Sequence, residues 1–120
     1  MVVVIGKLAK PLQVRNLPSG LSLACFDLQV ARSDESADTV PVALFDSGDE
    51  IPNWPTGQAL MAVGRVRRRF FRVGGSTQSR TEVVAEKVLP IVEKEDVRRV
   101  LAETGQFLAQ YAEQVMAERS

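Results

Sequence analysis

The sequence predicts a mainly β domain that is followed by one amphipathic α-helix. Alternating and β-branched runs recur through the first 90 residues, whereas the last 30 residues have apolar positions at spacings of four and three. The chain has 120 residues, and 45% of them are hydrophobic, which suits one compact domain with a modest core. We therefore expect a β domain over residues 1–90 and a helix within residues 91–120.

Five segments have the composition of β-strands, and turn-forming residues separate them. They comprise residues 2–8, 21–31, 39–45, 59–71 and 81–88. Pro18-Ser19-Gly20 predicts a tight turn between the first two strands, and Gly74-Gly75-Ser76 predicts another between the last two. Residues 46–57 contain two prolines and two glycines and therefore favour an irregular connector over a helix.

The C-terminal segment has apolar residues at the spacing of a heptad stripe. This apolar stripe comprises Val97, Leu101, Leu108, Tyr111 and Val115. One helix from about residue 93 to residue 118 places the stripe on one face, and acidic residues near its start suit the positive end of the helix dipole. A face of this length packs on its own domain or on a second subunit more often than on a foreign protein. We expect it to serve oligomerisation or docking.

Composition excludes several classes of site. Cys25 is the only cysteine and the chain has no histidine, so an intramolecular disulfide is impossible and zinc sites built from several such ligands are excluded. No cluster of titratable groups accompanies a nucleophile, so we expect no enzyme activity, no metal and no cofactor. The apolar run at residues 1–5 is too short for a signal peptide or a membrane span. These features are typical of a cytoplasmic protein.

The stretch from Gly64 to Arg72 carries the strongest functional signal. The two-residue period of a strand places four of its side chains on one face: Arg65, Arg67, Arg69 and Phe71. Guanidinium groups bind phosphates and stack on π-faces, and an aromatic ring offers any nucleic-acid base an apolar platform. The alternative is a solvated strand whose basic edge prevents aggregation between sheets.

The formal net charge is zero, but the charges are unevenly distributed along the chain. Residues 33–64 hold six acidic residues and no basic one, and residues 65–81 hold six arginines and no acidic residue. This pattern is compatible with a polyanionic partner, although the attraction is weaker than for a strongly basic domain. Alternatively, the acidic segment neutralises the arginines and the domain serves protein assembly.

Five strands with a long, charged hairpin between the last two describe an OB-fold, a small Greek-key barrel that commonly binds oligonucleotides. The chain also resembles bacterial single-stranded DNA-binding proteins, from residue 2 to about residue 90. The resemblance rests on the order and spacing of several segments, together with the basic strand that ends in Phe71: Val3-Val4-Ile5-Gly6-Lys7-Leu8, Val14-Arg15-Asn16-Leu17-Pro18-Ser19-Gly20, Phe26-Asp27-Leu28-Gln29-Val30-Ala31, Val40-Pro41-Val42-Ala43-Leu44-Phe45 and Thr81-Glu82-Val83-Val84-Ala85.

This resemblance implies a homo-oligomer, a dimer or a tetramer, that binds single-stranded DNA without sequence preference in replication, repair or recombination. Whether RNA also binds is left open. Phe45 and Phe71 match aromatic stacking positions of the family, and three arginines match basic ones: Arg15, Arg67 and Arg69. The full set expected to bind nucleic acid comprises Lys7, Arg15, Phe45, Arg65, Arg67, Arg69, Phe71, Arg72 and Arg80.

Two aromatic residues allow two interpretations each. Phe45 is out of phase with Val42 and Leu44, which suit a core, so we expect it to point away from the barrel interior. A core residue at the barrel end is the alternative. Trp54 falls near a family position that is usually an apolar plug, which favours a core role over base stacking.

The chain also departs from the family pattern. Thr39 stands where the family has a further aromatic, and the loop at residues 33–38 is short and acidic. The predicted helix ends in Glu118-Arg119-Ser120, without the acidic, hydrophobic tip that recruits replication and repair partners in the family. Fewer stacking platforms predict weaker binding. The alternative function is therefore an OB-fold adaptor, such as a replication-restart protein, with weak or no nucleic-acid binding.

Overall fold

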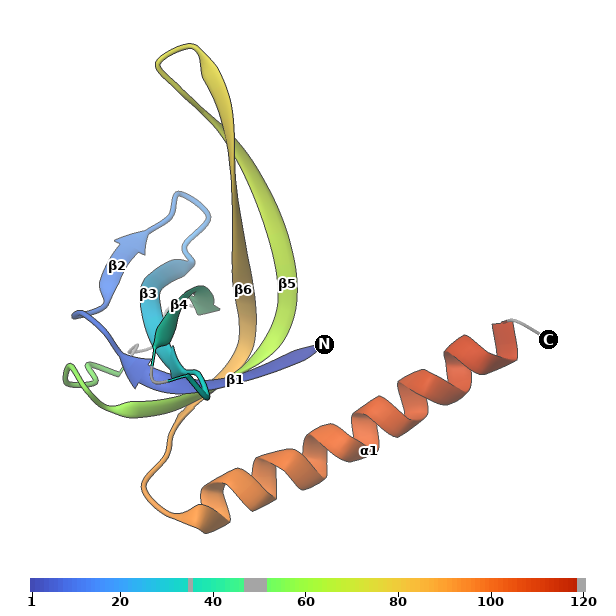
Figure 1. The fold of residues 1–120 in the computed structure, drawn as a ribbon. Coiled ribbons are helices and arrows are strands. Elements are labelled where there is room, and N and C mark those ends of the chain that lie inside the picture. The colour runs from blue at the N-terminus through green and yellow to red at the C-terminus, as the bar shows by residue number, and fades with distance from the viewer. Residues whose placement is uncertain (35, 47–51, 119–120) are drawn as a thin grey trace. The chain divides into compact units, whose positions relative to one another are not determined.

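The structure is a computed structural model that describes residues 1–34, 36–46 and 52–118. Figure 1 shows its elements. They are β1 (Val2–Leu8), β2 (Gln13–Asn16), β3 (Ser22–Ala31), β4 (Ala37–Asp46), β5 (Ala59–Val73), β6 (Ser76–Pro90) and α1 (Lys94–Glu118). The chain divides into two compact units, Met1–Pro90 and Ile91–Ser120, and each unit is described by itself below.

The strands of the first unit form one sheet that closes on itself. Their order is β1-β5-β6-β4-β3-β2, and β1 also pairs with β3, which completes the barrel. Neighbouring strands are antiparallel except β4 and β6, which run parallel from Val42↔Val83 to Leu44↔Ala85. All five predicted strands are present, so the prediction of a mainly β barrel is confirmed.

The sequence analysis missed β2. Leu8 pairs with Leu28 of β3, and Gln13 pairs with Cys25 of the same strand. Five residues separate Leu8 from Gln13, but only three separate their partners on β3. The ladder along β3 is therefore interrupted between β1 and β2. Pro11 lies in this break and has no backbone N–H to donate to a ladder. All four residues of β2 are exposed, which leaves no alternating pattern to detect. The predicted turn at residues 18–20 is present, but it joins β2 to β3.

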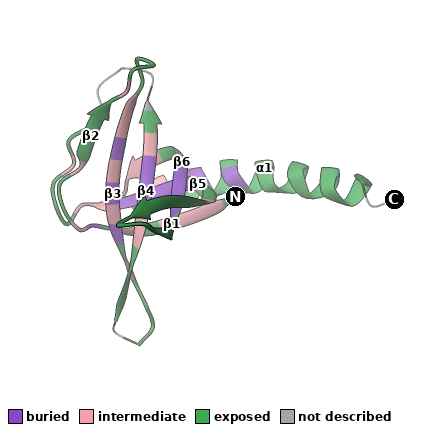
Figure 2. Ribbon diagram, turned by 90° about the horizontal axis from the view of Figure 1, so that it is seen from above, coloured by how far each residue is buried: buried purple, intermediate pink, exposed green. Residues whose placement is uncertain are grey.

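The hairpin of β5 and β6 extends well beyond the barrel (Figure 1). Its ladder continues to Val73↔Ser76, and Gly74 and Gly75 form the turn with φ values of +57° and +84°. Two consecutive residues with positive φ are typical of a type I′ turn, whose twist matches the flanking strands. The predicted glycine turn is confirmed. β5 continues to Val73 instead of residue 71, and β6 begins at Ser76 instead of residue 81. Figure 2 shows exposed residues along the outer part of this hairpin.

The barrel core consists of inward-facing residues from five strands: Leu8, Phe26, Leu28, Val42, Leu60, Ala62, Val83 and Ala85. Leu44 and Trp54 pack against this cluster. The rings of Trp54 and Phe26 meet edge to face, with centroids 6.3 Å apart. Trp54 is therefore part of the barrel packing, as the sequence favoured. In the predicted irregular connector, residues 47–51 lie outside the described residues, and residues 52–58 form turns and irregular structure.

Helix α1 of the second unit begins within one residue of its predicted start and ends at Glu118 as predicted. The Asp96 carboxylate accepts hydrogen bonds from the backbone N–H groups of Glu93 and Val92, at 3.0 and 3.1 Å. These bonds satisfy two backbone donors that immediately precede the helix, and they lower the pKa of Asp96. No helix among the described residues has the length and apolar character needed to cross a membrane.

Candidate nucleic-acid interface

One outer face of the barrel gathers most of the predicted binding residues. Strand alternation places Arg67 and Arg69 on the side of β5 away from the core, and their cross-strand partners on β6 are Glu82 and Arg80. The neighbouring strand β4 contributes Phe45 to this outer face, because Val42 and Leu44 face the core. Phe45 is 38% exposed, which agrees with the outward orientation expected for it.

Phe45, Arg67 and Glu82 form one contact group on this face. The Arg67 guanidinium carbon lies 6.0 Å from the centroid of the Phe45 ring. Arg67 donates hydrogen bonds from Nε and Nη2 to Glu82 Oε1, at 3.2 and 2.5 Å. The Nε atom of Arg69 lies 3.9 Å from the same oxygen. Glu82 is only 5% exposed, so a buried carboxylate holds a cation beside an aromatic ring.

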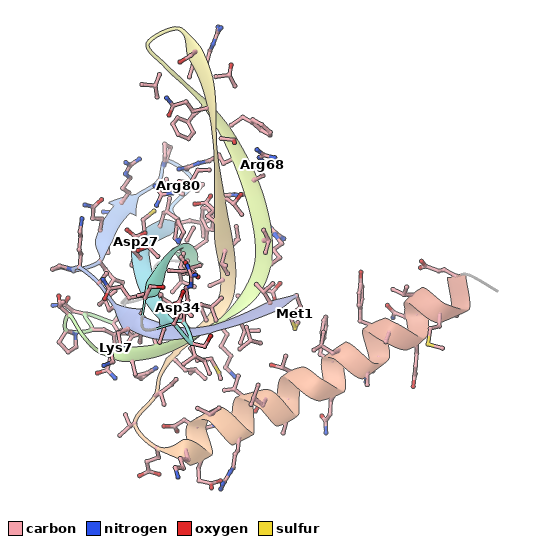
Figure 3. All side chains as sticks on the ribbon, in the orientation of Figure 1. Met1, Lys7, Asp27, Asp34, Arg68 and Arg80 are labelled. Atoms are coloured by element: carbon pink, nitrogen blue, oxygen red, sulfur yellow. The ribbon has the colours of Figure 1, made fainter. Side chains whose placement is uncertain are left out.

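A groove of about 200 Å³ lies across the same face. Residues of five strands, β2 to β6, line it, including Asp27, Arg69, Arg80 and Glu82, and Lys10 borders it from the segment after β1. Arg80 donates to Asp27 across 3.4 Å. Figure 3 shows Arg80 and Asp27 near each other on the barrel. The groove is therefore polar and carries both cations and carboxylates.

Arg15 and Lys7 lie in different places relative to this face. Arg15 pairs with Leu23, and Leu23 pairs with Phe45, so Arg15 is in register with Phe45 two strands away. Lys7 pairs with Gln29 and Ala59 and borders a second cavity, of about 390 Å³. In Figure 3 Lys7 lies at the end of the barrel away from the hairpin. The structure does not bring Lys7 to the groove.

The hairpin carries a second basic and aromatic surface that the sequence analysis overlooked. Phe70 is 65% exposed, and the Arg68 guanidinium carbon lies 5.6 Å from its ring centroid. Arg68 also donates to Ser79 Oγ at 3.0 Å. Arg72 shares this side by alternation, while Phe71, 37% exposed, lies on the other. The signal was present in the sequence, because the same two-residue period places arginine and phenylalanine on both sides of β5.

The described carboxylates of the acidic loop before β4 pair with Arg32 and not with the arginines of β5. Arg32 pairs with Asp34 at 2.9 Å and with Asp38 at 3.2 Å. Hydrogen bonds from Ser36 lower the pKa of Asp34. Glu35, Asp49 and Glu50 of the acidic segment lie outside the described residues, and the side chain of Asp46 is not described either. Among the side chains that the structure describes, the carboxylates that pair with arginines of β5 and β6 come from β3 and β6.

Arg15, Arg65 and Arg72 make no ion pair with any part of the chain that the structure describes. These three guanidiniums are the ones most available to an external anion. The described residues contain no group of three or more side chains that could hold a metal ion. Cys25 is a free, half-buried cysteine that lines the groove.

A curated relative, Single-stranded DNA-binding protein 1 of Streptococcus pyogenes serotype M18 (strain MGAS8232), is 35% identical over 104 residues, which is 79% of each protein. The chain belongs to the single-stranded DNA-binding protein family. No family model matches it. Among solved structures, the N-terminal domain of the PriB protein from Thermoanaerobacter tencongensis, described as dimeric, superimposes with a TM-score of 0.59 at 23% identity. That match covers 77% of this chain and 96% of the PriB domain, and it supports the OB-fold of this family member.

Proposed function

We propose that this chain binds single-stranded DNA without sequence preference on the outer face of β5, β6 and β4 and along the hairpin. The observation that carries this proposal is the exposure of Phe45 and Phe71 beside arginines on one continuous face. Membership of the single-stranded DNA-binding protein family supports the ligand class. Bases stack on the rings, and stacking does not discriminate strongly among bases.

The proposed roles of the basic residues differ with their partners. Arg15, Arg65 and Arg72 contact phosphates, because no carboxylate of the described structure competes for them. Arg69 and Arg80 line the groove and exchange part of their present contacts for phosphate oxygens. Lys7 attracts single-stranded DNA only at long range, since it borders a different cavity.

This activity places the protein in the bacterial cytoplasm with the nucleoid, in DNA replication, repair or recombination. Its role is binding rather than catalysis, and it acts as a homo-oligomer. The dimeric structure of the PriB domain is consistent with such an assembly. Replication or repair proteins are the further partners expected of a protein that coats single strands.

The direct test is a titration of fluorescently labelled oligo-dT at several salt concentrations. Each phosphate that a cation neutralises contributes about −0.7 to the slope of log K against log salt for single strands. The slope is therefore about −2 if only Arg15, Arg65 and Arg72 neutralise phosphates, and about −3.5 if Arg69 and Arg80 do so as well. A duplex of the same length should bind more weakly. Undetectable binding to oligo-dT at low salt would refute the proposal.

An adaptor role is the second candidate, because Glu82 and Asp27 already engage Arg67 and Arg80. Under this alternative, exchanging Arg67 and Arg69 for glutamate changes the oligomeric state or partner capture, and neither form binds oligo-dT. Loss of oligo-dT binding in the variant alone would favour the DNA-binding role.

We propose in addition that α1 uses its apolar stripe to hold a second subunit or the barrel. Leu101, Leu108, Tyr111 and Val115 are all exposed large apolar side chains. Exchanging Leu108 for glutamate places a charge in the middle of the stripe, whereas Gln106→Glu places the same charge on the opposite side of the helix.

We expect Leu108→Glu to lower the mass in solution or the melting temperature, and Gln106→Glu to leave both unchanged. Light scattering measures the mass, and a thermal melt reports docking within one chain. Equal mass and equal melting temperature for the two variants would contradict both forms of the proposal.

A further inference from the structure

We propose that Glu82 is a positioning residue of the interface, which withholds Arg67 from phosphates and keeps its guanidinium beside Phe45 as part of the base-stacking surface. This inference rests on the proposed function and assigns a task to one cation within it. The starting observation is that the Glu82 carboxylate lies on the face that we propose to bind a polyanion. A negative charge there repels DNA, so its position calls for a physical reason.

The contacts of Glu82 single out Arg67. The two residues face each other across β5 and β6, and both Arg67 Nε and Arg67 Nη2 donate to Oε1 of Glu82. Two donors from one planar group define the plane of the guanidinium as well as its position. In that position the guanidinium carbon is 6.0 Å from the centroid of the Phe45 ring, within reach of a cation–π contact.

Burial makes this pair difficult to exchange. The side chain of Glu82 is 6% exposed and that of Arg67 is 36% exposed. If Arg67 moved to a phosphate, the Glu82 carboxylate would be left buried with only Arg69, whose Nε is 3.9 Å away. Breaking a buried ion pair from one side is costly, because the remaining charge is shielded from water and here would keep only one distant partner. Arg67 therefore stays on Glu82 when DNA binds, and it offers its flat face rather than its charge.

The pair of Arg80 and Asp27 is the contrasting case on the same face. Its N–O distance is 3.4 Å, and the Asp27 side chain is 32% exposed. Water can replace Arg80 at Asp27, so Arg80 can turn to a phosphate at little cost. The two carboxylates therefore act differently: Asp27 merely competes with DNA for a cation, whereas Glu82 removes a cation from phosphate binding altogether.

The experiment compares Glu82→Gln with Asp27→Asn in the full-length protein, since each removes one negative charge from this face. Oligo-dT affinity is measured by fluorescence anisotropy across a salt series. In Glu82→Gln the released Arg67 gains a phosphate, so the slope of log K against log salt becomes steeper by about 0.7. In Asp27→Asn the affinity rises while the slope stays at the wild-type value. Equal slopes in Glu82→Gln and wild type would overturn the proposal, as would an equal steepening in both variants.

A second variant tests the proposal even if Glu82→Gln does not fold. Arg67→Lys retains the charge beside Glu82 but lacks the planar group that lies beside Phe45. We expect about a two- to fivefold loss of affinity with an unchanged salt slope, in keeping with an exposed cation–π contact. Unchanged affinity would overturn the stacking role of Arg67. If the wild-type protein itself binds no oligo-dT, the proposed function fails before any variant is compared.

Discussion

Replacing Phe45 or Phe71 by alanine is expected to weaken oligo-dT binding by about 1–3 kcal/mol, or roughly fivefold to 150-fold, in a protein that remains folded. Both rings are more than a third exposed, so they lose little packing when they are truncated. What they lose is the apolar surface on which we propose that a base stacks. Fluorescence anisotropy measures the affinity, and a thermal melt checks the fold.

Two other phenylalanines serve as controls for this prediction. Phe26 is 6% exposed in the core, and its truncation should lower the melting temperature strongly. Phe70 lies on the other side of the hairpin with Arg68, so its truncation measures how much that second surface contributes. Unchanged affinity in folded Phe45→Ala and Phe71→Ala proteins would assign both rings a structural role and contradict the proposed interface.

Replacing Gly64 by alanine is expected to destabilise the barrel by about 3 kcal/mol, the upper end of ordinary overpacking costs. A Cβ at this position would lie 2.0 Å from the backbone oxygen of Val84 and 2.8 Å from Cα of Ala85. Both atoms are backbone, so β5 and β6 would have to separate. Gly64 sits at a bulge, where the ladder shifts between Val63↔Lys87 and Gly64↔Ala85. Urea denaturation followed by circular dichroism measures the loss.

Gly105 provides the matched control for Gly64. A Cβ at Gly105, in the interior of α1, would meet no atom within 4 Å. Alanine should therefore stabilise the helix by about 1 kcal/mol, because glycine is a poor helix former. Stability that is equal in Gly64→Ala and wild-type protein would mean that the two strands of the hairpin are not held as closely as the ladder requires.

Local sequence patterns predicted every element that has a regular hydrophobic period or is bounded by clear turn-forming residues. The alternating runs marked five strands, the heptad spacing marked α1 to within one residue, and two adjacent glycines marked the hairpin turn. They failed at β2, because a four-residue, fully exposed strand on the far side of Pro11 has no period of its own. Its existence depends on pairing with β3, which is a non-local contact.

The sequence by itself determined that arginines and phenylalanines share the faces of β5, because side chains alternate along any strand. Only the tertiary structure decided which of these cations remain available to an anion. Glu82 is 15 residues from Arg67 along the chain, and Asp27 is 53 residues from Arg80. Strand register brings each pair together, and burial decides whether the pair can open. Strand register and burial cannot be obtained from charge counts along the chain, since both arise when distant strands close into a barrel.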